Sequence, residues 1–189
     1  MPTHSFASLS LMWFVMMTTM MAPAVWPWAA AYRKLSTVGS GFSRTTVFVS
    51  GYAAAWLLYS ISAASIQLLL PHELPKPIAA VILFTAGAFQ FAPLKRACLM
   101  HCRNPLTYFL TRWCDGASGG FRMGFHHGVF CVACCWALMA TTIAVGVMSL
   151  WWMAALAVVT FAEQVSPWGN RVRIAVGWAL IVSAVTLRW

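Results

Sequence analysis

Long stretches without a formal charge are the feature of this 189-residue chain that most limits its fold. Asp, Glu, Lys and Arg are absent from residues 1–32, 45–72, 77–94, 123–162 and 174–187. A helix needs about 20 apolar residues to cross the hydrocarbon core of a bilayer. The 40 residues of 123–162 are therefore enough for two helices with a turn near 146–149. The sequence predicts an all-α transmembrane helix bundle of about six spans.

The predicted spans lie near residues 5–32, 45–70, 77–93, 123–145, 148–165 and 172–188, within a single domain covering 1–189. The sixth contains only 14 charge-free residues, so it crosses only if Arg173 and Arg188 extend their guanidinium groups outward. Pro93 is expected to end or bend the third span, because proline lacks the N–H that a helix interior needs. Residues 94–122 then form a connection on the cytoplasmic side.

The chain is strongly basic, with 12 Lys and Arg residues against 3 acids. If the N-terminus lies outside, ten of the basic residues fall in cytoplasmic segments, and only Lys76 and Arg188 fall outside. Because Lys and Arg are retained on the cytoplasmic side in short loops, we expect a multi-pass inner-membrane protein with both termini outside. We expect it to contact the lipid bilayer and to bind no nucleic acid, because its basic residues are not concentrated on one helix or ribbon.

All six cysteines lie between positions 98 and 135. Cys98 and Cys102 are four residues apart with His101 between them, so a helix there would place both thiols on one face. Cys114 follows later in the same connection. The reducing cytoplasm, where this segment is predicted to lie, argues against structural disulfides. That location favours thiols that are available to a metal ion.

A second group of cysteines begins the fourth span. Cys131, Cys134 and Cys135 occupy positions i, i+3 and i+4, and His127 lies one turn earlier. His126 falls on the opposite side of this helix and is a weaker candidate. Small residues on the face of the thiols would let another helix approach closely, so the thiols are expected to point at a neighbouring helix. These small residues are Gly124, Gly128 and Thr142.

Clustered thiols are typical of sites for soft metals, because thiolates bind Cu(I), Zn(II) and iron–sulfur clusters. The alternative is that each free cysteine packs as a small apolar residue between helices. The joint spacing of two groups, each with a histidine, favours the metal site. The candidate ligands are Cys98, Cys102, Cys131, Cys134, Cys135, His127, His101 and Cys114.

Methionines repeat along the first span, where Met12, Met16 and Met20 recur every fourth residue beside Met17 and Met21. Thioethers are soft ligands that favour Cu(I) over Zn(II), although methionine also serves as flexible filler between helices. Together with the cysteines, the methionine row favours copper as the metal, with zinc as the alternative.

Few polar side chains fall inside the predicted spans. Glu163 ends the fifth span, where an interfacial ion pair with Arg171 and Arg173 is expected. Gln90 is expected to find a hydrogen-bond partner inside the bundle. Five tryptophans near predicted span ends are expected to be interfacial anchors: Trp26, Trp28, Trp113, Trp168 and Trp189.

Several segments resemble a bacterial family of predicted metal-binding integral membrane proteins whose function is largely uncharacterised. The matching segments are 13–23, 90–98, 102–105, 127–139, 146–148 and Glu163, and they include Pro-Leu-Lys-x-x-Cys at 93–98 and Cys-x-x-Cys-Cys-Trp at 131–136. Ser149 and Gln164 stand where the family pattern leads us to expect Asn and Lys. The resemblance supplies no reaction, but it implies five ligands: Cys98, Cys102, Cys131, Cys134 and Cys135.

The first functional hypothesis is an integral membrane protein that binds Cu(I) through thiolates at the cytoplasmic end of the bundle, for transport, storage or delivery to a metalloenzyme. The second is a non-catalytic accessory subunit of a larger membrane redox or oxygenase complex, in which the cysteines are structural. A thiol–disulfide oxidoreductase is a third, but Cys-x-x-Cys lies here in a span without a thioredoxin-like fold. An enzyme is not predicted, because P-loop, G-x-G-x-x-G and H-E-x-x-H motifs are absent and carboxylates are too few for paired acid–base catalysis.

Overall fold

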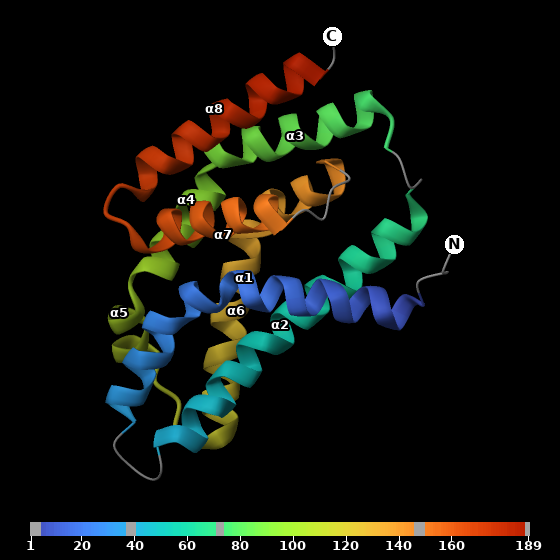
Figure 1. The fold of residues 1–189 in the computed structure, drawn as a ribbon. Helices are drawn as coiled ribbons and strands as arrows, with labels where there is room; N and C mark the ends of the chain where they lie inside the picture. The colour runs from blue at the N-terminus through green and yellow to red at the C-terminus, as the bar shows by residue number, and fades with distance from the viewer. Residues whose placement is uncertain (1–4, 37–40, 71–73, 146–149, 188–189) are drawn as a thin grey trace.

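The computed structural model describes residues 5–36, 41–70, 74–145 and 150–187. Regular structure within these ranges is entirely helical, which confirms the predicted all-α class. The helices are α1 (Phe6–Leu35), α2 (Gly41–Leu69), α3 (Lys76–Phe91), α4 (Pro93–Arg103), α5 (Pro105–Thr111), α6 (Gly116–Val145), α7 (Leu150–Val165) and α8 (Gly169–Leu187). Figure 1 shows their arrangement.

Four of the helices are long and apolar enough to cross a membrane: α1, α2, α6 and α8. A fifth candidate is formed by α3 and α4 together, although their axes differ by 63°. The apolar part of α7, Trp151–Val165, is shorter. The six-span count and the placement of the termini stay predictions, and the predicted turn near 146–149 lies outside the described residues.

A sharp bend separates α3 from α4 at Pro93, as the sequence predicts. Ala92, the residue before the proline, is extended, with φ −61° and ψ 139°. Proline disfavours helical angles in the residue that precedes it and cannot donate a backbone hydrogen bond. The bend directs α4 against α6 and α7. Much of the predicted connection 94–122 is therefore helical, and α4 buries Cys98 and Cys102.

Close packing of α2 against α6 depends on three glycines. A Cβ at Gly124 would overlap the carbonyl oxygen of Phe48, and one at Gly51 would overlap the backbone of α6. At Gly128, an added Cβ would lie 3.0 Å from the Tyr52 carbonyl oxygen. Small residues permit such close approach of two helices. This confirms that the small-residue face of α6 meets a neighbouring helix, and it identifies the neighbour as α2.

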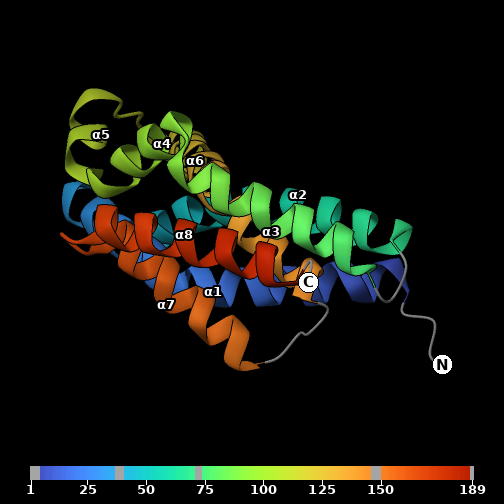
Figure 2. The same ribbon diagram turned by 90° about the horizontal axis from the view of Figure 1, so that it is seen from above.

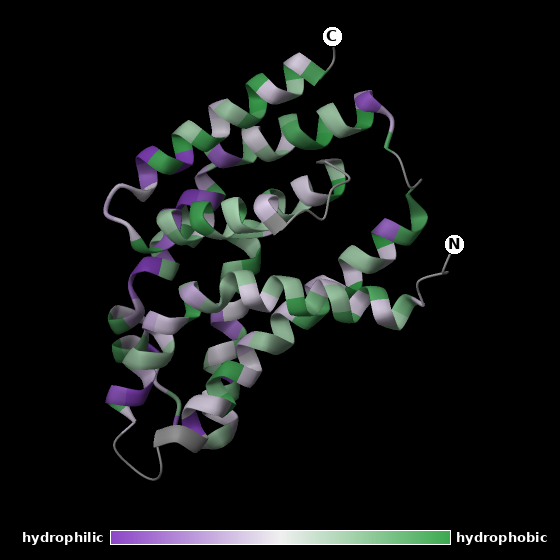
Figure 3. Cartoon of the chain, viewed as in Figure 1, coloured by the Kyte–Doolittle hydropathy of each residue, from purple (hydrophilic) through white to green (hydrophobic). Residues whose placement is uncertain are grey.

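Polar segments gather on one side of the molecule. Figures 1 and 2 both place α4 and α5 away from the start of α1 and the end of α8. Hydrophilic residues concentrate along that side, in α4, at the end of α1 and in the first turns of α8 (Figure 3). Arg33 and Lys34 occupy the last turn of α1, which lies on the same side. That this side faces the cytoplasm stays a prediction.

Candidate metal centre

Three thiols converge in the interior of the bundle. The i, i+3, i+4 spacing on α6 places Cys131, Cys134 and Cys135 on one face, and each residue is 1% exposed. Their sulfur atoms all lie within 4.8 Å of one another, and the sulfurs of Cys134 and Cys135 are 3.3 Å apart. Two sulfurs that bind one ion at about 2.3 Å lie at most about 4.6 Å apart. Small side-chain rotations would therefore let these three residues, here called the thiol centre, share one ion.

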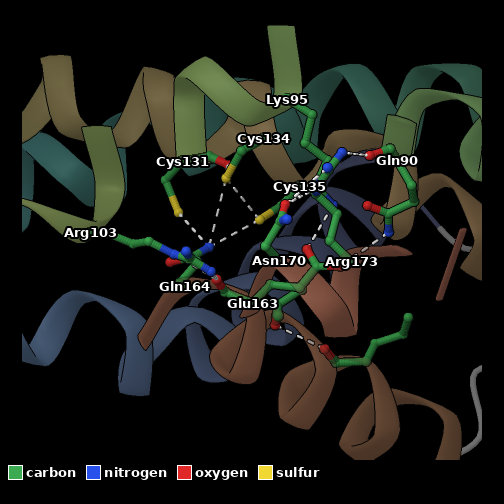
Figure 4. Close-up of polar contacts among 12 residues, drawn as sticks. Gln90, Lys95, Arg103, Cys131, Cys134, Cys135, Glu163, Gln164, Asn170 and Arg173 are labelled. Atoms are coloured by element: carbon green, nitrogen blue, oxygen red, sulfur yellow. Dashed lines mark hydrogen bonds and ion pairs between the residues drawn. The ribbon is translucent and has the colours of Figure 1, made fainter. Parts of the chain in front are cut away.

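An amide and a phenol contact the thiol centre from other helices. Nε2 of Gln164, near the end of α7, lies 3.1 Å from the sulfur of Cys135, 3.7 Å from that of Cys131 and 3.8 Å from that of Cys134 (Figure 4). The hydroxyl of Tyr52, on α2, lies 3.3 Å from the sulfur of Cys131. An amide nitrogen only donates hydrogen bonds. Gln164 is thus placed to stabilise negative charge on all three sulfurs, a role that the sequence did not predict.

The remaining cysteines differ in their distance from this centre. All six are free thiols. Cys102, on α4, is close enough to interact with the thiols of Cys131 and Cys134. Cys98 is buried one turn earlier on α4, and the partly exposed Cys114 precedes α6. Within the described residues, neither belongs to the group of thiols that share one position.

Two aromatic residues enclose His127, one turn before the thiol centre. Its ring stacks on Trp28 with centroids 3.6 Å apart, and the Tyr52 ring lies 5.5 Å away. Within the described part of the chain, Nδ1 of His127 is buried without a hydrogen-bond partner. Trp28 is 1% exposed and donates to the Cys102 carbonyl at 2.8 Å. Its prediction as an interfacial anchor is therefore wrong, because the α1 face that carries it packs inward.

His101 lies to one side of the thiol centre. Its ring stacks on Phe130 at 4.2 Å, and its centroid is 6.3 Å from that of His127. The described donor atoms that share one position with the thiols include no histidine nitrogen. The two predicted histidine ligands are thus close to the centre but not in it.

A buried ion pair lies beside the thiols. Nζ of Lys95 is 2.7 Å from Oε2 of Glu163, and both side chains are 1% exposed. Gln90 donates to Oε1 of Glu163 at 3.2 Å, which confirms that Gln90 finds a partner inside the bundle. The predicted pairing of Glu163 with Arg171 and Arg173 is wrong. The bend at the start of α4 brings Lys95 to the carboxylate instead.

Two arginines extend this polar network. Arg103 donates to the backbone carbonyl of Glu163, from Nε at 3.1 Å and from Nη2 at 2.5 Å. Arg173 donates to the carbonyl of Gln90 and, from Nη2 at 3.0 Å, to Oδ1 of Asn170 (Figure 4). Three cations and one carboxylate give this network a net charge of two positive units. Such charge favours anionic sulfur nearby.

A family-level match covers almost the whole chain. The model of a family described as "PpoB2: Copper chaperone" matches residues 10–187. No curated protein and no solved structure matches the chain. The matched region includes the thiol centre and the polar network beside it.

Proposed function

The chain belongs to the PpoB2 copper chaperone family, because the match covers most of its length, and we propose that it binds Cu(I) at the thiol centre and passes the ion to an acceptor protein. One observation carries the proposal: three buried thiols occupy one position with a hydrogen-bond donor aimed at them. Soft thiolates favour Cu(I), Zn(II) and iron–sulfur clusters over hard cations. The proposal places the protein in a membrane, since four to five helical segments are suited to spanning one.

Charge balance supports a monovalent cargo. Three thiolates with one Cu(I) carry two negative units, and the network of Lys95, Glu163, Arg103 and Arg173 carries two positive units. A buried charge is costly unless it is paired. The positive charge of Lys95 also acts on the Cys135 thiol. The network therefore stabilises the loaded state of the thiol centre.

The donor number favours Cu(I) over zinc. Structural zinc is almost always four-coordinate, whereas the thiol centre groups three thiols, with the donating amide of Gln164 beside them. Cu(I) accepts a smaller set of soft donors. An incomplete donor set also suits release, because a donor from an acceptor protein can join the ion before a thiolate leaves. A copper-dependent metalloenzyme is the acceptor that we propose.

The test is Cu(I) binding to the full-length protein, purified anaerobically in mild detergent and titrated against a chromogenic Cu(I) chelator. We expect one tightly bound Cu(I) per chain. Substituting Ser for Cys131, Cys134 and Cys135 together should lower the affinity by at least 100-fold. Cys114→Ser is the matched control, because it removes a thiol outside the thiol centre, and it should bind like the wild type. Equal copper content in all three proteins would contradict the proposal.

Delivery is tested in cells that make a copper-dependent enzyme. Deletion of this chain should lower the copper content of that enzyme, and the wild type, but not the thiol-centre variant, should restore it. An enzyme that is fully loaded without the chain would contradict the delivery role. A stable complex with other subunits, with copper content independent of the thiols, would instead support the structural accessory role.

A further inference from the structure

A separate cleft of about 380 Å³ lies where α4, α5 and α6 meet. His101 and Met100 line it from α4, and His126 lines it from α6. Its rim includes Asn104 and Arg112, which are exposed. The cleft is therefore reachable from outside the bundle, unlike the buried thiol centre.

Both imidazoles in this cleft carry a nitrogen without a protein partner. Within the described residues, Nε2 of His101 and Nδ1 of His126 are buried and make no hydrogen bond. Stacking holds the rings instead: His101 packs on Phe130, and His126 lies parallel to Tyr108 with centroids 5.5 Å apart. Leaving a buried polar atom without a partner is unfavourable, so two in one cleft point to a ligand that both would bind.

The separation of the two rings suits one shared metal ion. Their centroids are 5.7 Å apart. Imidazole nitrogen binds metals at about 2.0–2.1 Å, so two rings that share an ion have centroids at most about 6.4 Å apart. Arg112 adds positive charge at the rim, which disfavours cations held mainly by charge. An ion in this cleft must be held by its bonds to the imidazole nitrogens, which favours a soft ion over hard divalent cations.

We propose that His101 and His126 form a second Cu(I) site, in which the ion is acquired before it reaches the thiol centre. Met100 places a thioether in the same cleft as a further soft donor. The site stands on the cleft geometry alone, whereas its role in acquisition rests on the proposed function.

A short path joins the two sites. The His101 ring lies 6.3 Å from that of His127, which lies one turn before Cys131 on α6 and near enough for their charges to interact. Each transfer forms a bond from copper to the next donor and breaks one to the previous donor. Copper stays Cu(I) throughout and no electron moves. The protons that copper displaces from the thiols leave to water.

The site is tested on the thiol-centre variant, in which Ser replaces Cys131, Cys134 and Cys135. Cu(I) is added anaerobically as its acetonitrile complex and examined by X-ray absorption. We expect one weakly bound ion with nitrogen scatterers. Adding His101→Asn and His126→Asn should remove it. No nitrogen-bound copper in the thiol-centre variant, or nitrogen-bound copper that survives both histidine substitutions, would overturn the proposal.

Acquisition is tested by the rate at which Cu(I) loads the intact thiol centre. The variant with His101→Asn and His126→Asn should load at least tenfold more slowly but reach the same final copper content. Thr107→Val, an isosteric change in the same cleft, should load like the wild type. Unchanged rates in the histidine variant would overturn the acquisition role. If the wild-type thiols bind no copper, the proposed function fails, yet the nitrogen signal still tests the site.

Circular dichroism and thermal unfolding in detergent confirm that each variant is folded. The single variants His101→Asn and His126→Asn provide the same comparison if the double variant does not fold. Each should weaken the nitrogen-bound copper by at least tenfold, because one imidazole remains. Wild-type affinity in both folded single variants would overturn the site.

Discussion

Soft sulfur donors gather in two regions of the molecule that differ in their surroundings. The thiol centre contacts an amide and a phenol, and the charge of Lys95, part of a buried ion network, acts on Cys135. The methionine row of α1 has no such setting. Met16 and Met20 are buried and line, with Met153, a cleft of about 700 Å³ between α1 and α7. Apart from Ser8 and Thr19, whose hydroxyls bond to carbonyls nearby in the chain, that lining is apolar.

The difference shows that donor type alone does not define a metal site. A thiolate that holds copper is an anion, so it needs hydrogen-bond donors and counter-charge when buried. Methionine is neutral and packs without either. The thiol centre has both supports, whereas the methionine row is built like the core around it. We therefore assign metal binding to α6 and packing to the methionines of α1.

Breaking the ion pair of Lys95 and Glu163 should have the largest effect on the stability and the Cu(I) affinity of the thiol centre. Lys95→Met leaves the Glu163 carboxylate buried without its cation, which costs roughly 3–5 kcal/mol, and removes a positive charge that acts on Cys135. We expect lower stability in thermal and denaturant unfolding and at least tenfold weaker Cu(I) binding.

The double variant Lys95→Met/Glu163→Met separates the two effects. Replacing both members of a buried pair with apolar residues is often neutral for stability, so unfolding should return toward that of the wild type. The net charge of the network is again two positive units, but the Lys95 charge that acts on Cys135 is gone, so Cu(I) affinity should stay below that of the wild type. Wild-type copper affinity in this double variant would show that the thiol centre does not depend on Lys95.

Removing the amide donor should have the next largest effect. Gln164→Leu keeps the approximate volume but deletes the N–H groups that face the sulfurs. Hydrogen bonds to charged groups contribute about 1.5–3 kcal/mol, so Cu(I) affinity should fall by roughly 10–100-fold. Competition with the chromogenic chelator measures this change. Gln67, which accepts a bond from Trp13 far along α2, is the control position, and Gln67→Leu should bind copper like the wild type.

A smaller effect should distinguish the two cysteines of α4. Cys102 interacts with the thiol centre and Cys98 does not belong to it. Cys102→Ser should speed copper release to the chelator by about three- to tenfold, because a nearby thiol helps to retain the ion. Cys98→Ser should release at the wild-type rate. Equal rates in both variants would remove Cys102 from the site.

The smallest effect is expected at the methionine row. Leu replacing Met12, Met16 and Met20 conserves volume and should alter stability by less than about 1.5 kcal/mol per substitution. Cu(I) affinity and loading rate should stay within about twofold of the wild type, since these neutral side chains act as packing groups. A clear loss of copper binding or loading in this variant would place part of the copper path along α1. The thiol centre and the methionine row would then both take part in copper handling.

Local features of the fold were predictable from the sequence because they depend on neighbouring residues. Charge-free stretches predicted the helical class, and Pro93 predicted the bend between α3 and α4. The spacing of Gly124 and Gly128 predicted a close contact with another helix. The spacing of Cys131, Cys134 and Cys135 likewise placed three thiols on one helix face. The structure brings their sulfur atoms within 4.8 Å of one another.

Contacts between distant helices were not predictable in the same way. Gln164 meets Cys135 across 29 residues, and Trp28 meets Cys102 across 74. Lys95 reaches Glu163 only because α4 turns by 63° from α3. These pairings depend on how each helix is rotated against its neighbours, which residue spacing along one helix does not determine.

X-ray absorption of the wild-type protein loaded with one Cu(I) tests the thiol centre most directly. We predict a first shell of three sulfur atoms, which the substitution of Cys131, Cys134 and Cys135 by Ser abolishes. A shell of nitrogen or oxygen in the wild type, or a sulfur shell that persists after those substitutions, would contradict the assignment of copper to these three thiols.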